Sequence, residues 1–322
     1  MKTRDSVDRI LAIYNDKAPL SEASTIPAPW YVDPRIAELE TQTVFSKAWQ
    51  MIGRIDQVEK AGQFVSAFVA GEPVVAVRGN DGVLRAFYNV CRHHAAAVVT
   101  EPCGQAQLLH CPYHGWNYGL DGSLKGMPEF DGVKNFERQQ NGLVPVRAEI
   151  WEKFVFVNLD PHAESLASFL GGLVKRAAPL GLATLNFFDT RAYDIACNWK
   201  VFVDNYLDGG YHVPHLHKGL NSVLDYKEYT IENEDRYCLQ SSPMVSSQDD
   251  AHREYNQQSV AVGARVQDED LGICEDVQRG LKSRAYGAGR LSVRREAGEQ
   301  LFHRLLAADL KSGLTHAAVA AD

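Results

Sequence analysis

The chain lacks a long apolar stretch. None of its hydrophobic runs approaches the roughly 20 residues that a membrane-spanning helix requires. Residues 1–20 contain one apolar stretch that charge interrupts and no small-residue cleavage site, so this segment does not look like a secretion signal. These absences predict a soluble protein with the cytoplasm as its default location.

Basic residues are too few for a typical nucleic-acid-binding protein. The chain has 33 lysines and arginines against 41 acidic residues, and its net charge of −8 is compatible with a partner that presents a basic face. The six cysteines are scattered, so we expect buried free thiols and no disulfide framework. The length of 322 residues and the 45% hydrophobic content predict two domains, because one domain typically has roughly 100 to 200 residues.

What the sequence does contain is a metal-binding pattern in two matched halves. Cys91 and His93 form the first half, and Cys111 and His114 form the second. Two cysteines and two histidines are the ligands of a Rieske [2Fe-2S] cluster, in which the cysteines hold one iron and the histidines hold the other. The pattern predicts these four residues as cluster ligands in a protein that carries one electron at a time.

A tetrahedral zinc site is the alternative for the same residues, because two cysteines and two histidines also suit Zn²⁺. Zinc fingers usually pair cysteine with cysteine in one half and histidine with histidine in the other. Here each half contributes one of each, which favours the cluster. The following segment, residues 115–122, is typical of a short strand that runs into an Asp-Gly turn.

The hydrophobic patterns predict an α+β fold in three parts. Residues 1–45 are helical or irregular and are punctuated by prolines. Residues 46–160 form an all-β module of short strands with the metal loops at its tip. Residues 161–322 form a second domain, which starts with helix and has a strand at about 191–197.

A second group of polar residues lies on a predicted helix that begins at Trp199, where apolar residues between 199 and 207 recur at helical spacing and predict a buried face. Asp204, Asp208 and His212 follow one another at intervals of four residues, so they share a polar stripe beside that face, although a solvated surface would have the same pattern. Pro214 disfavours helical geometry in the residue before it, which predicts that the helix ends where His212 sits. His217 can then turn back toward His212.

Three motifs together resemble the catalytic alpha subunit of Rieske non-haem iron oxygenases of the aromatic-ring-hydroxylating type. They are CRHH at 91–94, CPYHGWNYGLDG at 111–122 and NWKVFVDNYLDGGYH at 198–212. The resemblance extends from about residue 30 to about residue 310, and it is nearest to the branch that contains choline monooxygenase. One departure is that His94 and Ala95 stand where many members have Arg-Gly.

The resemblance implies that His212 and His217 are ligands of a mononuclear iron, with His215 as the competing choice for the second. Two histidines and one carboxylate form the facial triad of non-haem Fe(II). Asp208 matches the family's acidic residue that links a Rieske histidine of one subunit to an iron-bound histidine of the next. Such a carboxylate fixes the tautomer of the ligating imidazole.

The carboxylate ligand is predicted in the acidic cluster 267–270, which is expected to head a helix. Asp268 and Glu269 there are explained equally well as partners of the helix dipole. Asp270 lies on an otherwise apolar face, where a carboxylate needs a partner, and the resemblance points to it as the third ligand. The remaining histidines, including His303, lack a partner at ligand spacing and are predicted to have surface or packing roles.

The resemblance implies an enzyme, an oxidoreductase that uses O2 and electrons from a reductase or ferredoxin to hydroxylate a small organic substrate. The implied assembly is a homotrimer, and the implied cofactors are a Rieske [2Fe-2S] cluster and a mononuclear Fe(II). The nearest branch favours a quaternary ammonium compound such as choline, held by an aromatic cage. An aromatic ring hydroxylated by a dioxygenase is the alternative, and a Rieske electron carrier or an inactive truncated homologue is an alternative of another class.

The catalytic domain is expected to be a helix-grip antiparallel sheet that is internally truncated. Only two strands, at 226–231 and 236–241, are predicted before a polar stretch at 246–254 that starts another helix. The resemblance implies several more strands here, and sheets usually have about 4 to 6 strands. The missing strands predict an open pocket, weak iron retention and exposed apolar surface.

Overall fold

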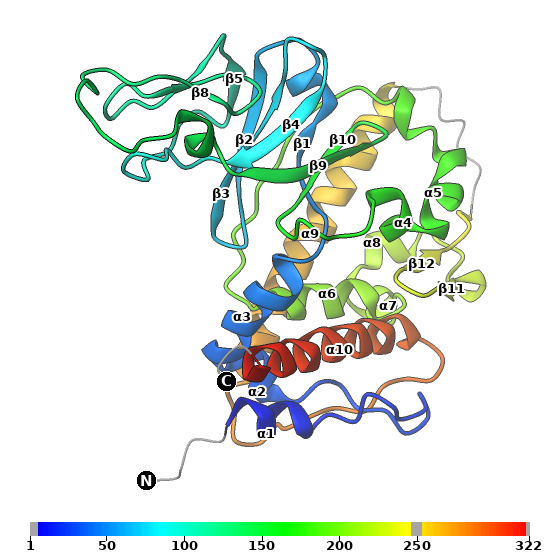
Figure 1. The fold of residues 1–322 in the computed structure, drawn as a ribbon. Coiled ribbons are helices and arrows are strands. Elements are labelled where there is room, and N and C mark those ends of the chain that lie inside the picture. Colours follow the sequence, from blue (N-terminus) through cyan, green and yellow to red (C-terminus); the bar gives the residue numbers. More distant parts are fainter. Residues whose placement is uncertain (1–5, 246–252, 320–322) are drawn as a thin grey trace. The chain divides into compact units, whose positions relative to one another are not determined.

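The computed structural model describes residues 6–245 and 253–319 and divides the chain into two compact units (Figure 1). We call residues 40–188 the β unit, and the described parts of residues 1–39 and 189–322 the helical unit. The predicted domain limits at residues 45 and 160 stay predictions. Within the described ranges, the structure contains no helix that combines the length and the apolar character needed to cross a membrane.

The β unit is built on a seven-stranded antiparallel sheet. Its strands, in spatial order, are β1 (Gln50–Arg54), β10 (Phe154–Asn158), β9 (Pro145–Trp151), β4 (Leu84–Tyr88), β3 (Glu72–Arg78), β2 (Gln63–Val69) and β5 (Cys103–Gln105). A smaller sheet contains β6 (Leu109–His110), β7 (Asn117–Tyr118) and β8 (Leu124–Gly126). The short helices of the unit are η1 (Thr41–Phe45), η2 (Ile55–Val58), η3 (Arg138–Asn141), α4 (Leu166–Leu170), α5 (Gly172–Ala177), η4 (Ala178–Leu180) and η5 (Leu182–Thr184). The all-β module with short strands is therefore confirmed.

Strand β3 explains why this sheet has a core on both faces. Val74 to Val77 are all fully buried, and successive side chains of a strand point to opposite faces. Val75 and Val77 pack into one apolar cluster, while Val74 and Ala76 pack into another. The first cluster also contains Cys91, Cys111 and Trp116, so the two predicted metal loops pack on this part of the core.

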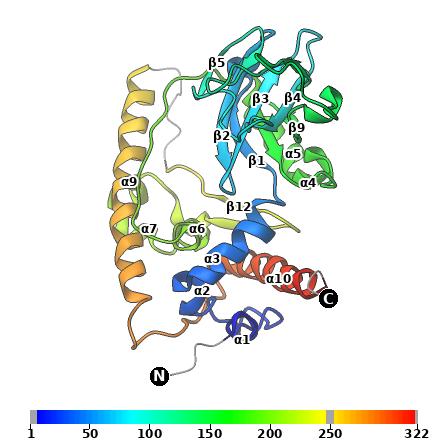
Figure 2. The same ribbon diagram turned by 60° about the vertical axis from the view of Figure 1, so that its left-hand side comes forward.

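The helical unit contains the helices α1 (Val7–Ala12), α2 (Ala28–Val32), α3 (Pro34–Glu40), α6 (Trp199–Leu207), α7 (Val213–Leu216), α8 (Lys218–Asn221), η6 (Tyr226–Glu228), α9 (Arg253–Gly280) and α10 (Ala297–Val319). Helix α6 packs against both α9 and α10 (Figures 1 and 2). Strands β11 (Thr230–Asn233) and β12 (Cys238–Ser241) form the antiparallel sheet of this unit. The α+β prediction is confirmed, and among the described residues this sheet has two strands.

Several local predictions differ from the structure. The described residues 191–197 form no strand. Helix α6 ends at Leu207, and Pro214 lies in the first turn of α7, so this proline begins a helix where we expected one to end. The acidic cluster 267–270 lies well inside α9, whereas we expected it to head a helix. Of the predicted polar stretch 246–254, residues 246–252 lie outside the described residues.

The buried face of α6 also differs from the prediction. Lys200 and Val201 are its buried residues, whereas Tyr206, on the face predicted to be buried, is exposed. The buried Lys200 ammonium group lies 5.4 Å from the ring centre of Trp199 and 5.7 Å from that of Tyr31. Cation–π attraction of this kind offsets part of the cost of removing the charge from water.

Candidate metal centres

The four predicted cluster residues lie in two loops of the β unit that have the same backbone design. In the first loop the Cys91 N–H donates to Ala96 and the Ala95 N–H donates back to the Cys91 carbonyl. In the second loop the Cys111 N–H donates to Trp116 and the Gly115 N–H donates back to the Cys111 carbonyl. Ala95 and Gly115 both have a positive φ, of 61° and 73°. Each loop thus presents one cysteine and one histidine in the same way.

The two loops keep the sulfurs inside and the imidazoles outside. Cys91 and Cys111 are 3% and 2% exposed, whereas His114 is exposed and His93 is half-buried. Burial raises the pKa of the Cys111 thiol, and backbone N–H groups of Tyr113 and His114 act against this increase. Donors directed at a sulfur stabilise its thiolate, which is the form that binds iron.

The imidazoles of the first centre are close enough to share a metal group. The rings of His93 and His114 have their centres 4.7 Å apart. Ligand nitrogens of His93, His94 and His114 lie within 4.8 Å of one another. Nδ1 of His93 is buried and has no hydrogen-bond partner among the described residues, as a nitrogen reserved for a metal would be. The donor set therefore fits a Rieske cluster.

Two aromatic residues support this centre. The Trp116 ring stacks on His93 with ring centres 4.7 Å apart and planes 6° apart. The Tyr118 hydroxyl lies 3.4 Å from Cys91 Sγ and accepts a hydrogen bond from the Arg92 N–H at 2.9 Å. Hydrogen bonds to sulfur tune cluster potentials. The sequence did not predict the role of Tyr118, because only the pairing of β7 with β6 places its hydroxyl beside Cys91.

In the helical unit the structure brings together His212, His217 and Asp270. Their ligand atoms lie within 4.8 Å of one another. Oδ1 of Asp270 is 3.0 Å from Nε2 of His217 and 3.7 Å from Nε2 of His212. His217 and Asp270 are 1% and 3% exposed. His215, the competing choice, is exposed and is not part of this group.

Each histidine of this group has a carboxylate behind it. His212 Nδ1 lies 2.6 Å from Asp208, and His217 Nδ1 lies 2.6 Å from Glu269. These contacts leave both Nε2 atoms directed at Asp270. Metal-binding histidines commonly give their other ring nitrogen to a carboxylate, so the arrangement fits a mononuclear metal ion. Burial lowers the pKa of His212, but the hydrogen bond and charge of Asp208, together with the charge of Asp270, outweigh this and raise it.

Glu269 is a site residue that sequence reasoning did not single out. In the sequence a role as a partner of a helix dipole explained it equally well, but it lies deep within α9, on the turn that also carries Asp270. Asn205 donates a hydrogen bond to Asp270 Oδ1 at 2.8 Å. The adjacent Asp268 is exposed. The sequence would have indicated Glu269 only if the start of the helix had been placed well before residue 267, so that Glu269 lay inside the helix.

Two glycines let Asp208 reach His212. Gly209 and Gly210 both have a left-handed backbone, with φ of 67° and 68°. A Cβ at Gly209 would lie 2.0 Å from the Arg295 carbonyl oxygen, and one at Gly210 would lie 2.8 Å from the Tyr229 ring. The backbone bulge that follows Asp208 therefore requires glycine, because other residues rarely adopt this conformation.

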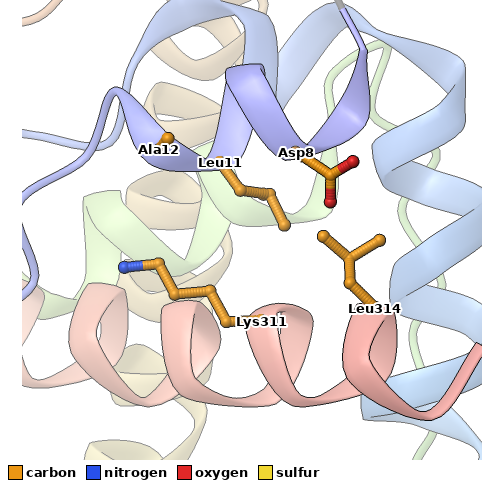
Figure 3. A pocket seen from close by; sticks show the side chains of 5 residues that line it. All are labelled: Asp8, Leu11, Ala12, Lys311 and Leu314. Atoms are coloured by element: carbon orange, nitrogen blue, oxygen red, sulfur yellow. The ribbon is translucent and has the colours of Figure 1, made fainter. Parts of the chain in front are cut away.

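A cavity of about 190 Å³ adjoins this group and is lined by His212, His217 and Asp270 together with Tyr206 and Tyr229. A larger hollow, of about 410 Å³, lies between α1 and α10, where Leu11 and Leu314 point toward each other (Figure 3). Lys311 beside it pairs with Asp16 at 2.8 Å. That hollow contains no group of metal-ligating side chains among its lining residues, so the smaller cavity is the candidate substrate site.

Two family models match the chain, and each covers one of the two sets of metal ligands. Residues 48–137 match the Rieske [2Fe-2S] domain. Residues 182–242 and 236–312 match the ring hydroxylating alpha subunit catalytic domain in two segments. These two domains imply a Rieske cluster and a mononuclear non-haem iron.

Known proteins resemble the chain over 65% to 95% of its length. Choline monooxygenase from Arabidopsis thaliana chloroplasts is 32% identical over 372 residues, which cover 95% of this chain and 87% of that protein. The carnitine monooxygenase oxygenase subunit of Escherichia coli K12 is 39% identical over 215 residues, covering 65% of this chain and 56% of that protein. The crystal structure of a quaternary ammonium Rieske monooxygenase with L-carnitine has a TM-score of 0.80 at 26% identity, covering 95% of this chain and 99% of that one.

The fold and the two ligand sets define a Rieske oxygenase catalytic subunit. The chain belongs to the family that includes the choline and carnitine monooxygenase oxygenase subunits. The alignment with the plant enzyme is longer than this chain, so that enzyme has residues with no counterpart here. Members of this family use electron-transfer partners and O2 and act on small substrates.

Proposed function

We propose that this protein is the oxygenase component of a monooxygenase that hydroxylates a small quaternary ammonium compound. The observation that carries the proposal is that one chain contains both a cluster ligand set and a buried two-histidine, one-carboxylate group. An electron carrier has no use for the second group. The relatives that cover most of this chain are named for choline and carnitine, which favours a quaternary ammonium substrate over an aromatic ring.

Within this proposal, Cys91, His93, Cys111 and His114 hold the cluster. His212, His217 and Asp270 hold the mononuclear iron. When bound, such an iron supplies open coordination positions for dioxygen and substrate.

The remaining residues of the iron site orient its ligands. Asp208 and Glu269 fix the tautomers of His212 and His217, so that both Nε2 atoms stay free for the metal. Asn205 holds the Asp270 carboxylate in place. Asp208 also couples the iron site to the cluster of a neighbouring subunit in a homotrimer. The electron donor is a reductase or ferredoxin with a basic face that complements the acidic chain.

Recognition of the substrate cation is assigned to the aromatic residues of the 190 Å³ cavity. Tyr206 and Tyr229 line it beside His212. The Tyr229 ring already lies 5.5 Å from the Arg295 guanidinium, so Tyr206 is the better candidate for a substrate cation. Tyr211 is exposed and is not among the residues that line this cavity.

Oxygen consumption with matched substrates tests the proposal. The full chain is supplied with a reductase, and O2 uptake is compared for choline, carnitine and 3,3-dimethylbutanol, the neutral isostere of choline. Product-forming uptake with a cationic substrate and none with the isostere is the expected result. Naphthalene serves as the aromatic comparison, and turnover of naphthalene alone would reject the quaternary ammonium assignment.

Iron content distinguishes an oxygenase from a Rieske electron carrier and from an inactive truncated homologue. An oxygenase contains three irons per chain, two of which belong to the cluster that gives the reduced EPR signal, whereas an electron carrier contains two irons in total. Internal truncation predicts a third outcome, in which the mononuclear iron is lost easily and O2 is consumed without product. An Asp208→Asn variant should retain both metals and lose coupled turnover, and full product formation by this variant would contradict its coupling role.

A further inference from the structure

A third group of metal-ligating side chains lies between α6 and α10 and shares no residue with the two predicted iron centres. Asp204 comes from α6, and Glu299 and His303 come from adjacent turns of α10. Their ligand atoms lie within 4.8 Å of one another. His303 Nε2 is 2.9 Å from Asp204 Oδ1 and 3.8 Å from Glu299 Oε1. We propose that Asp204, Glu299 and His303 bind a divalent metal ion that is distinct from the mononuclear iron.

The Glu299 side chain is the strongest evidence for a missing cation. Glu299 is 5% exposed, and its carboxylate accepts no hydrogen bond from the residues that the structure describes. A buried carboxylate without a donor is costly, so it takes up either a proton or a cation. His303 is the nearest positive partner, and it already donates to Asp204 if its Nε2 carries the proton.

The surroundings add further negative charge to this position. Burial raises the pKa of Glu299 well above its ordinary value, and the charges of Asp204, Glu296 and Asp208 raise it further. A divalent ion would relieve this repulsion by lying between Asp204 and Glu299. A metal ion also inverts the local electrostatics, because it is the largest charge in such a site.

A cavity makes this group accessible. A space of about 170 Å³ is lined by Asp204 and Glu299 together with Tyr31 of α2 and Cys274 of α9. The Tyr31 hydroxyl lies 2.5 Å from Asp204 Oδ2 and leaves Oδ1 directed at His303. A hydrogen-bonded ligating carboxylate is typical of a metal site, because the second contact fixes its orientation.

The donor set indicates the kind of metal. One imidazole and two carboxylates, with a phenol behind one of them, suit Mn²⁺, Fe²⁺ or Zn²⁺ better than Ca²⁺, which prefers six or more oxygens. The group contains no thiolate ligand. Mn²⁺ is therefore the useful probe, because it prefers oxygen and nitrogen donors and competes poorly for the cysteines of the cluster.

Mn²⁺ binding to the full chain tests the proposal. The protein, with its cluster intact, is freed of loosely held divalent ions by a chelator and equilibrated anaerobically with Mn²⁺. Bound metal is then counted by equilibrium dialysis and EPR. Wild type is expected to bind two Mn²⁺ per chain, and Glu299→Gln is expected to bind one. His217→Ala is expected to lose the other one, and the double variant to bind none.

The Glu299→Gln variant distinguishes a metal from a proton. Glutamine has the shape of a protonated glutamate, so it leaves a proton-sharing structure intact but removes a metal ligand. Equal Mn²⁺ binding by wild type and Glu299→Gln would overturn the proposal. Glu296→Gln is the matched control, since Glu296 accepts from the Ser292 N–H and lies outside the group, and it should still bind two.

The same experiment separates this site from the iron site. If His217→Ala binds as much Mn²⁺ as wild type while Glu299→Gln binds less, the assignment of His217 as an iron ligand is rejected. The metal site at Asp204, Glu299 and His303 is then supported. If only His217→Ala loses metal, this site fails and the proposed function stands. Metal binding to the folded state also raises the melting temperature. Mn²⁺ should therefore stabilise His217→Ala but not the double variant.

Discussion

In the β unit the proposed cluster ligands lie within residues 91–114, in two loops that repeat one backbone pattern over a shared apolar core. In the helical unit the proposed iron ligands lie between residues 212 and 270, with His212 and His217 at the two ends of α7 and Asp270 within α9, and each depends on a polar partner behind it. The first centre is organised by local backbone hydrogen bonds, and the second by side-chain contacts between helices. Substitutions should therefore disrupt the two centres in different ways.

The two units also differ in how their sheets are built. The β unit has a seven-stranded sheet with buried residues on both faces, whereas the described part of the helical unit has a two-stranded sheet. Two strands alone do not make a stable layer. The helical unit therefore depends more on helix packing, and its metal site on contacts such as those of Gly209.

The largest expected effect is the loss of a ligand in the β unit. His114→Ala should abolish the cluster, because one iron would keep a single protein ligand on its histidine side. Visible absorption and EPR after dithionite would measure this loss, while the mononuclear iron should remain. His94→Ala is the matched control and should retain the cluster. An unchanged reduced Rieske signal in His114→Ala would remove this residue from the ligand set.

The second largest effect is expected at the bulge of the helical unit. Gly209→Ala would place a Cβ 2.0 Å from the Arg295 carbonyl and force a left-handed backbone on alanine. We expect it to lower the free energy of unfolding by roughly 2–4 kcal/mol, measured by urea denaturation. Gly219→Ala is the control, because a Cβ there meets nothing within 4 Å. Equal stability of the two variants would show that the bulge does not constrain the site.

A smaller effect is expected from removing one partner behind a ligand. Glu269→Gln should weaken iron binding by about 10- to 100-fold, because Glu269 fixes the tautomer of His217. Iron affinity can be measured by competition with a chelator, and the cluster signal should not change. Asp268→Asn, a change at the exposed neighbour, should bind iron normally. Matching affinities of the two variants would remove Glu269 from the site.

The smallest effect compares the two loops of the β unit directly. Ala95 has the positive φ that Gly115 has in the other loop, so Ala95→Gly should stabilise the protein by roughly 0.5–1 kcal/mol. Gly115→Ala should destabilise it by a similar amount, because the new Cβ would also approach Pro128 to 3.1 Å. Thermal unfolding of both variants measures the difference. The same sign of change in both would contradict the shared design of the loops.

The first centre could be predicted from the sequence because its information is local. Cysteine and histidine spacing identified Cys91, His93, Cys111 and His114, and turn residues identified the strands around them. The departure at Ala95 was visible in the sequence, but its backbone strain was not. The supporting hydroxyl of Tyr118 was missed, because its position under Cys91 depends on strand pairing.

The second centre could be predicted only in part. Helical spacing placed Asp208 near His212, and an apolar face singled out Asp270. The same reasoning started α9 too late and therefore treated Glu269 as a partner of a helix dipole. It also gave His303 no partner, because Asp204 lies 99 residues away in the sequence.

The sequence by itself determined the kinds of ligand and the family, because short motifs fix which chemical groups are present and how far apart they lie along the chain. The tertiary structure alone decided that Glu269 stands behind His217 and that Asn205 contacts Asp270. Hydrogen bonds between side chains on different helices depend on helix packing, and packing is set by contacts across the whole unit. For the same reason, the group formed by Asp204, Glu299 and His303 became visible only once α6 and α10 were placed side by side.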